Sequence, residues 1–211
     1  MARSVRPRIG GTETSEALRN LRSLQVLVLH PRDEDGEELL RHLKRIGCQT
    51  QAAWPPPRQL PDPVDVVFLS LRPVIEAQLS FSWKADNPPA ALVVVVDYEN
   101  PVMVDAVLKL NAQAVIGLPI RPFGLLTNLV SAHALFTRER KLQRRIEKLE
   151  EKVRSIKRLN QAKEILMRNH GLDEDEAYRM IRSQAMNKRM TTEAIAVAII
   201  NASEILGLKQ D

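Results

Sequence analysis

The stretch LFTRERKLQRRIEKLEEKVRSIKRLNQAKEILM, residues 135–167, decides how this chain is organised. Its apolar residues recur at steps of seven, four and three, which is the heptad spacing of a coiled-coil helix. Neither glycine nor proline occurs in residues 125–170, so one helix of about 69 Å could run through them. Such a helix needs a second copy to cover its apolar seam. We therefore expect a homodimer through Leu142, Ile146, Leu149, Val153 and Ile156.

Asn160 takes the a position of the heptad after Val153. A polar residue at this position fixes the register of a two-stranded coiled coil at some cost in stability. The alternative is that the coiled coil, expected over residues 135–160, has already ended and Asn160 is a surface residue.

Composition excludes several classes of protein. The single cysteine, Cys48, rules out an intramolecular disulfide framework and a Cys-rich zinc site. The longest apolar run, residues 90–96, is far shorter than the roughly 20 residues that span a membrane. The first residues contain no apolar signal core, so we expect a cytoplasmic protein. The four histidines show neither metal-ligand nor catalytic-triad spacing, so we predict no enzyme, no metal site and no cofactor.

Charge is distributed unevenly along the chain. Residues 21–136 carry 10 basic and 12 acidic side chains, whereas residues 137–170 carry 12 basic and 5 acidic ones. A basic helix is usually a solvated coiled coil. The local excess nevertheless favours a polyanionic partner, of which nucleic acid is the commonest.

The first part of the chain predicts alternating strands and helices. Residues 1–14 lack periodicity, and we expect residues 1–20 to be a disordered basic arm, with a short entry helix over residues 15–23 as the alternative for its end. Compact apolar runs predict strands at residues 24–29, 64–69, 91–96 and 114–118, and residues 48–53 offer a weaker strand signal. Helical spacing covers residues 39–46, ended by Gly47, and a second helix runs to Leu110 from Asn100 and Pro101 as N-cap and first residue. Strands that are apolar throughout indicate a parallel sheet covered on both faces.

These units over residues 21–134 resemble the receiver domain of two-component response regulators, a flavodoxin-like α/β fold. The resemblance implies Mg²⁺-binding carboxylates after the first strand, an aspartate that accepts phosphate at the end of the third, a hydroxyl after the fourth, and a lysine after the fifth. At these places the chain has His30 and Pro31, then Ser70, then Val96 or Asp97, then Leu118. Asp33, Glu34 and Asp35 come three residues too late and are expected to cap the next helix. We therefore expect a pseudo-receiver without a metal site or phosphoacceptor.

Residues 156–211 predict a bundle of three short helices. Gly171 ends the first helix, and Asp173 with Glu176 forms a capping box for the second. The second helix is expected to bury Ala177, Met180, Ile181, Ala185 and Met186. The third is expected to bury Ala194, Ile195, Ala198, Ile199, Ala202 and Ile205. The pattern alone indicates a packing unit first and a nucleic-acid-binding module second.

The same segment carries a more specific resemblance. AKEILM at residues 162–167 is followed at fixed spacing by Gly171, Glu176, Ala177, Tyr178, Arg182, Ala185, Met186 and Ala196. This pattern resembles the ANTAR domain, the RNA-binding module of transcription antiterminators. Glu164 and Ile181 depart from the usual glycine and leucine, and Glu164 places a carboxylate where RNA would approach.

Further motifs resemble the antiterminators of amidase operons, namely LQVLVL at 24–29, RIGC at 45–48, WPPP at 54–57, VDVVF at 64–68 and NQAK at 160–163. This resemblance implies a dimer built on the coiled coil. It also implies a ligand-sensing partner of the periplasmic-binding-protein type, which keeps the regulator silent until a small amide arrives. No residue pattern in the chain indicates that partner independently.

For RNA binding, the bundle offers one aromatic surface and several donors. Tyr178 can stack on an unpaired base, and Gln161 can address a base edge. Phosphate-neutralising candidates are Lys163, Arg168, Arg182, Lys188 and Arg189. Two alternatives remain open at this point: Arg182 could pair with Glu174 or Asp175, and Tyr178 could pack in the bundle core.

The sequence thus predicts an antiterminator that binds hairpins of leader RNA and prevents a terminator from forming. One rival is a DNA-binding, response-regulator-like transcription factor with a helix-turn-helix, which needs exposed base-reading side chains on its recognition helix. The third helix is mostly alanine and isoleucine, which argues against it. The other rival is a coiled-coil scaffold for protein partners.

Overall fold

The computed structural model describes residues 21–57, 59–72, 88–97 and 101–205. The chain divides into two compact units on either side of the bond between Arg140 and Lys141. The expected arm of residues 1–20 and the expected N-cap Asn100 lie outside the described residues. No helix in the described ranges is long and apolar enough to cross a membrane.

The first unit is built on a parallel sheet. Its strands are β1 (Gln25–Leu29), β2 (Gln49–Ala52), β3 (Val66–Leu71), β4 (Ala91–Val96) and β5 (Ala114–Gly117), in the order β2-β1-β3-β4-β5. The helical elements that the structure describes here are η1 (Leu21–Ser23), α2 (Glu34–Ile46), α4 (Pro101–Lys109) and the beginning of α5 (Pro122–His170). This strand order is that of a flavodoxin-like fold, so the predicted fold class is confirmed.

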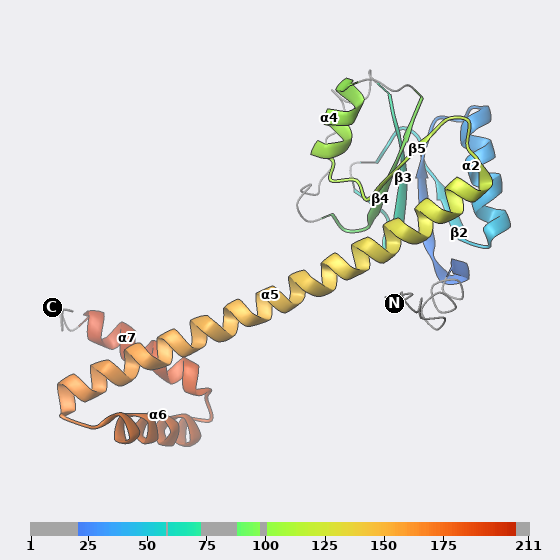
Figure 1. Cartoon of the computed structure of the whole chain (residues 1–211). Helices are drawn as coiled ribbons and strands as arrows, with labels where there is room; N and C mark the ends of the chain where they lie inside the picture. The colour runs from blue at the N-terminus through green and yellow to red at the C-terminus, as the bar shows by residue number, and fades with distance from the viewer. Residues whose placement is uncertain (1–20, 58, 73–87, 98–100, 206–211) are drawn as a thin grey trace, which may run out of the picture. The chain divides into compact units, whose positions relative to one another are not determined.

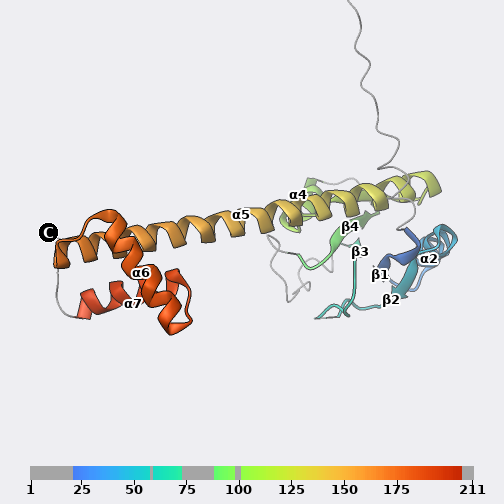
Figure 2. The same ribbon diagram turned by 90° about the horizontal axis from the view of Figure 1, so that it is seen from below.

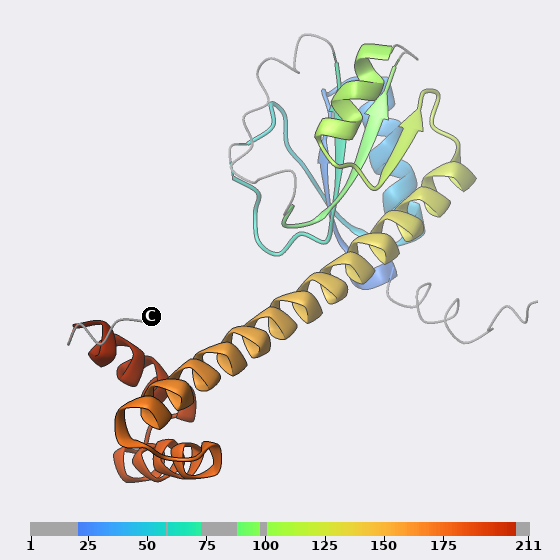
Figure 3. The ribbon, with the colours of Figure 1, turned by 60° about the vertical axis from the view of Figure 1, so that its left-hand side comes forward.

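Strands β1, β3 and β4 are almost wholly apolar and buried because both faces of the sheet are covered there, whereas β2 has the sequence QTQA and is mostly exposed. Val26, Val28, Val66 and Phe68 pack under α2 and the beginning of α5, which contributes Leu125 and Leu129. The alternate residues of the same strands, such as Leu27, Leu29 and Val67, pack with Met103 and Ala106 of α4. Figures 1 and 3 show α2 and α4 on opposite sides of the strands. The period-two alternation of side chains therefore divides one apolar run between two cores.

Strand β3 is shifted from its predicted range of residues 64–69 to Val66–Leu71, whereas the ends of α2 agree with the predicted caps. Strand β3 starts at Val66 rather than residue 64, because the residue before it, Asp65, contacts β1 through its side chain, which accepts a hydrogen bond from the Gln25 amide at 2.8 Å. Helix α2 starts at Glu34, five residues before its apolar pattern, and Asp33 caps it as predicted, because the Asp33 side chain accepts a hydrogen bond from the Gly36 amide. Gly47, at φ 100°, ends this helix as predicted.

The second unit contains the rest of α5, α6 (Glu174–Lys188) and α7 (Thr192–Ile205). Figure 2 shows α6 and α7 beside the last turns of α5. The core consists mainly of small and aliphatic side chains: Ala162, Leu166, Ala177, Ile181, Ala185, Ile195 and Ala196. Alanines at these contacts allow the three helices to approach one another closely.

Several residues predicted to be buried in α6 and α7 are not. Met180 is 39% exposed, Met186 70% and Ile205 84%, and Ala198 and Ala202 are also exposed. In α6 only Ala177, Ile181 and Ala185 are buried, which is a narrow stripe at steps of four. In α7 the buried residues are Ile195, Ala196 and Ser203. The bundle core therefore combines small residues with a few aliphatic side chains such as Ile181 and Ile195, and leaves Met180, Met186 and Ile205 outside.

Candidate nucleic-acid interface and the receiver-like sheet edge

The carboxyl ends of β1, β3 and β4 meet at one edge of the sheet, where doubly wound folds place their ligands. His30 follows β1 and is 4% exposed, and Ser70, near the end of β3, is fully buried. Asp97 follows β4 directly. At this edge the resemblance to receiver domains implies a metal site and a phosphoacceptor, and the chain lacks the expected residues for both.

Arg72 occupies this edge with a fixed positive charge. Its Nη2 lies 2.5 Å from Asp33 Oδ2, and its Nε lies 3.6 Å from Asp97 Oδ2. The other Asp33 oxygen, Oδ1, lies 3.2 Å from His30 Nδ1. Sequence reasoning missed this arrangement because the partners of Arg72 are 39 and 25 residues away and no local pattern connects them.

The environment of Asp33 favours its charged form. Burial acts to raise the pKa of this carboxyl, but hydrogen bonds from the Gly36 amide and the Arg72 guanidinium, with the nearby charges of His30 and Arg72, hold the pKa below its ordinary value. The loop between β1 and α2, which contains His30 and Pro31, lies very close to the first turn of α2. A Cβ on Gly36 would lie 2.4 Å from the Pro31 carbonyl oxygen and 2.8 Å from His30 Nδ1. Glycine at position 36 is therefore required for this geometry.

A divalent cation would have to compete with Arg72 for the same carboxylates. In the described ranges, no group of three or more histidine, cysteine, aspartate or glutamate side chains comes together as a metal site would require. Four buried polar atoms at the edge have no hydrogen-bond partner among the described residues: His30 Nε2, Ser70 Oγ, Arg72 Nε and Asp97 Oδ1. The described residues at this edge thus form an ion-paired cluster rather than a cage of oxygen ligands.

The heptad residues of α5 form a half-exposed apolar seam in the single chain. Leu149 is 55% exposed and Ile146 48%, and the remaining members fall in the same range: Leu142, Val153 and Ile156. A continuous stripe of this size on an otherwise charged helix is what a second copy of the helix would cover.

Hydrogen bonds cap α6 at both ends. Asp173 accepts from the Glu176 amide at 2.7 Å, and the Glu176 side chain accepts in return from the Asp173 amide, so the predicted capping box is present. At the other end, the amide of Arg189 donates to carbonyls of the last turn of α6. Arg189 has φ 52°, a left-handed conformation that usually belongs to glycine at this position.

One side of α6 collects several of the predicted RNA-binding residues. Tyr178, Arg182 and Met186 recur at steps of four, so they lie along one side of the helix, and Arg189 follows directly after the helix as its C-cap. Tyr178 is 40% exposed and Arg182 is exposed. In the structure Arg182 forms no ion pair with Glu174 or Asp175, and Tyr178 lies outside the buried core, so neither alternative left open by the sequence is observed.

The other predicted residues are placed differently. The Lys163 amine lies 2.5 Å from Glu174 Oε1, and its side chain is only 15% exposed, so it joins α5 to the first turn of α6. Gln161 and Arg168 are seven residues apart and share another side of α5. Lys188, the last residue of α6, is exposed. The structure therefore does not gather all seven candidates on one surface.

Two residues of this region were missed by sequence reasoning. Arg158 lies 2.6 Å from Glu193 and joins α5 to the first turn of α7, as Lys163 does for α6. Met186 was expected in the core but is exposed beside Arg182. Its place in the 178–182–186 spacing was a signal that could have identified it.

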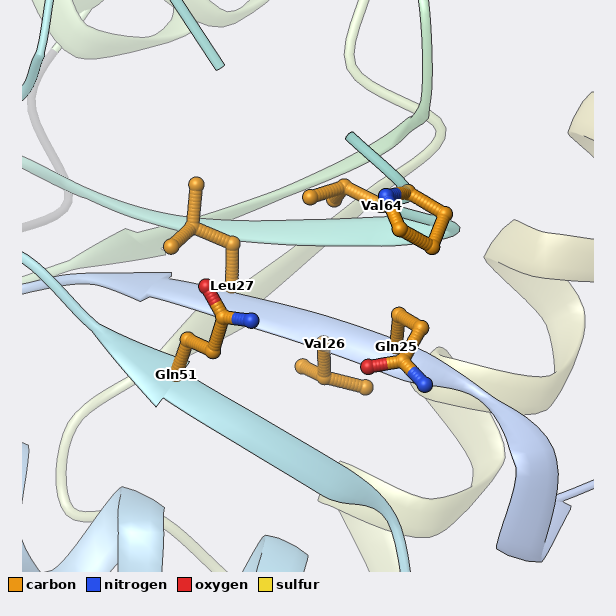
Figure 4. Close-up of a pocket in the computed structure, with 6 residues that line it drawn as sticks. Gln25, Val26, Leu27, Gln51 and Val64 are labelled. Carbon is orange, nitrogen blue, oxygen red and sulfur yellow. The ribbon is translucent and has the colours of Figure 1, made fainter. Parts of the chain in front are cut away.

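A shallow recess lies between β1, β2 and the segment before β3 (Figure 4), with an empty volume of about 140 Å³ that includes open solvent. It is lined by Gln25, Val26, Leu27, Gln51, Pro63 and Val64. The Gln25 side chain is already paired, because it donates to Gln49 Oε1 at 2.8 Å. The recess has no titratable lining residue and is not a candidate site.

Comparisons with known proteins define the class. Residues 24–133 match the family described as "AmiR, N-terminal", and residues 147–200 match the ANTAR domain. The chain is therefore a transcription antiterminator regulator that combines a receiver-like domain with an ANTAR domain. The aliphatic amidase regulator of Pseudomonas aeruginosa PAO1 is 37% identical over 184 residues, which cover 87% of this chain and 94% of that protein. The chain belongs to the AmiR family, as its sequence motifs predicted.

Two solved structures resemble the chain more distantly. A response regulator receiver protein from Burkholderia phymatum is 13% identical, covers 53% of this chain and 95% of its own, and has a TM-score of 0.40. A Burkholderia pseudomallei response regulator with a phosphorylated aspartic acid, calcium ion and citrate is 15% identical, covers 81% of this chain and 95% of its own, and also has a TM-score of 0.40. The fold assignment rests on the strand order instead.

Proposed function

We propose that this protein binds hairpins of leader RNA and so prevents a terminator from forming upstream of the genes it controls. The observation that carries the proposal is the exposed side of α6, where Tyr178 and Arg182 stand on a capped helix inside the ANTAR domain. RNA sequence is read mainly at unstacked bases, which need a flat side chain to stack on and donors for their edges and phosphates. The protein acts by binding, without catalysis.

A homodimer through the α5 seam presents two such bundles. Fully burying an apolar side chain is worth roughly 1.5–3 kcal/mol, and the seam offers five of them per copy. One bundle binds one hairpin, so the two bundles of a dimer bind the two hairpins of one leader RNA. The second contact then forms at a high effective concentration.

The principal test is a gel-shift titration with a two-hairpin leader RNA. Tyr178→Ala is expected to weaken binding by about 10-fold, because stacking on an aromatic side chain contributes roughly 1–3 kcal/mol per base. Arg182→Ala should also weaken it. Arg179→Ala is the matched control, since Arg179 lies in the same helix but donates to the Asp175 carbonyl oxygen at 3.3 Å.

The same titration distinguishes the rival functions. Equal affinity for duplex DNA would indicate a helix-turn-helix regulator. Absence of RNA binding at every salt concentration would indicate a scaffold. Equal RNA affinity of the Tyr178, Arg182 and Arg179 variants would remove the α6 surface from the proposal.

Lys163 requires a separate test because its amine is paired with Glu174. Lys163→Ala removes the cation, whereas Glu174→Gln releases it for another partner. If Lys163 binds phosphate, the first change lowers RNA affinity and the second preserves or raises it. If Lys163 only joins two helices, both changes lower the stability of the bundle similarly and RNA affinity changes equally in the two variants.

Control by a ligand-sensing partner completes the proposal. It is supported by the 37% identity to a protein named as an aliphatic amidase regulator. The partner, of periplasmic-binding-protein type, holds the regulator silent until a small amide binds. In a gel shift, adding such an amide-binding protein encoded beside this gene should suppress the RNA complex, and a small aliphatic amide should restore it. Suppression that the amide does not reverse would contradict this control.

A further inference from the structure

A row of four cations follows one side of α5 ahead of the bundle. Lys141, Arg145, Lys148 and Lys152 recur at steps of four, three and four residues, and all four are exposed. At 3.6 residues per turn they fall within an arc of about 60° on the helix. This row is called the basic stripe below.

The acidic residues of the same segment lie elsewhere on the helix. Glu147, Glu150 and Glu151 are displaced from the stripe by about 60° or more. Two of them are engaged, since Glu151 pairs with Arg154 at 2.7 Å and Glu147 accepts from Gln143 at 3.3 Å. No stripe cation forms an ion pair with another described residue. Within the single chain, the stripe is therefore an uncompensated line of positive charge.

The stripe also lies on the side of α5 that faces the bundle. Leu159, Lys163 and Leu166 continue the same arc toward the end of the helix. Leu159 and Leu166 pack with α6 and α7, and Lys163 reaches Glu174 at the start of α6. Figure 2 shows α6 and α7 together on one side of α5. A ligand held by the bundle thus has the stripe next to it within the same compact unit.

We propose that the basic stripe binds the phosphate backbone of the RNA stem whose loop is held by the bundle. The inference rests on the proposed RNA-binding function and extends its site along α5. Cores of protein–protein interfaces are poor in lysine and rich in aromatic and apolar side chains, whereas the stripe consists of lysine and arginine alone. Such side chains neutralise phosphates and position a duplex without reading its sequence.

Pairing of two copies strengthens the argument. In a parallel coiled coil, Arg145 of one copy faces Glu150 of the other, but Lys152 faces Lys157. Two like charges at such a position repel each other, and a phosphate group placed beside them relieves the repulsion. The stripe is thus better satisfied with bound polyanion than without it.

The test compares two doubly substituted variants of the full chain. Lys148→Gln with Lys152→Gln removes half of the stripe, and Arg154→Gln with Lys157→Gln removes the same charge from the opposite side of α5. Glutamine has a helix propensity close to those of lysine and arginine, so both variants should keep the helix. Each variant also removes one member of the Lys152–Lys157 repulsion, and light scattering should show the same oligomeric state for both.

Affinity is measured for hairpins with the same loop on a short or a long stem, over about 50 to 200 mM salt. The stripe variant should bind the long-stem hairpin about 10-fold more weakly than wild type, with a log–log salt slope smaller by roughly 1.5. It should bind the short-stem hairpin like wild type, and the control variant should lose little on either RNA.

Each other outcome overturns a defined part of the argument. If wild type binds RNA but both double variants behave alike, the stripe is not an RNA site while the proposed function stands. If the stripe substitutions weaken binding of an acidic protein partner and leave RNA binding unchanged, the ligand of the stripe is a protein and not an RNA stem. If wild type binds neither hairpin, the proposed function fails and the stripe proposal with it.

Discussion

The cations of the two units differ in what they contact. In the first unit, Arg72 is held between Asp33 and Asp97 at the sheet edge, so its charge is balanced within the fold. In the second unit, Arg182 and the basic stripe face solvent without a carboxylate partner among the described residues. Balanced charge contributes to the stability of the unit that contains it, whereas uncompensated charge is available to a polyanion. The predictions below separate these two uses of charge.

The largest effect on RNA affinity is expected from substitutions in the α5 seam, because the basic surfaces of two copies bind one RNA together only in a dimer. Leu149→Asp with Val153→Asp would bury unpaired charge at the centre of the seam, and light scattering should then report a monomer. Affinity for a two-hairpin RNA should fall by about 100-fold, since the second contact is lost. Gln143→Asp with Arg144→Gln gives the same charge change off the seam and should remain dimeric. A dimer that survives the seam substitutions at micromolar concentration would place the interface elsewhere.

The second prediction concerns loss of the ion pairs that Arg72 forms with Asp33 and Asp97. Arg72→Ala leaves Asp33 and Asp97 without their cation and should lower the free energy of unfolding of the first unit by about 1–2 kcal/mol, given that the pair is partly exposed. Both tryptophans of the chain lie in this unit, so fluorescence during urea unfolding reports on it. Arg41→Ala, which removes an exposed arginine of α2, is the control.

Adding Asp97→Asn to Arg72→Ala should recover part of the loss, because one of the two uncompensated charges is then gone. RNA affinity should be unchanged in all these variants. A fall in RNA affinity on Arg72→Ala at unchanged stability would show that the two uses of charge are not separate.

The sequence predicted the strands, caps and coiled-coil seam well, but not the Arg72 cluster or all of the buried residues in α6 and α7. Strands such as β4 and the cap at Asp173 were predictable because apolar runs and capping residues act over a few positions. The seam of α5 was visible for the same reason. The Arg72 cluster was not predictable, since it forms only when the ends of three strands meet. The buried faces of α6 and α7 were partly wrong because small residues, including Ser203, form the close contacts while Met186 stays outside.

The third prediction concerns pH and the same cluster. Asp33 has a pKa held below its ordinary value, so it contributes stability that is present above the unfolded-state pKa, near 3.8, and is lost as pH falls through the folded-state value. Between about pH 5 and pH 3, wild type should therefore lose stability of the first unit faster than Arg72→Ala. Urea unfolding followed by tryptophan fluorescence measures the difference. Parallel pH profiles of the two proteins would contradict the contribution of Arg72 to the Asp33 pKa.

The smallest expected effect on stability comes from substitutions of Arg189. This residue has a structural role through its backbone and a candidate RNA-binding role through its charge. Its backbone closes α6 in a left-handed conformation at φ 52°, and its side chain is exposed on the α6 surface. Glycine relieves the conformational cost but makes the unfolded chain more flexible, so Arg189→Gly should change stability by only about 0.5 kcal/mol. If the guanidinium contacts phosphate, RNA affinity should nevertheless fall roughly 3-fold at moderate salt.

Two further substitutions at position 189 separate the backbone from the charge. Arg189→Asn tolerates the left-handed conformation without the charge and should bind RNA like the glycine variant. Arg189→Lys keeps the charge and should bind like wild type. If all three variants bind RNA equally, Arg189 serves only to end the helix. The α6 surface would then depend on Tyr178 and Arg182, whose side chains point outward without any such backbone requirement.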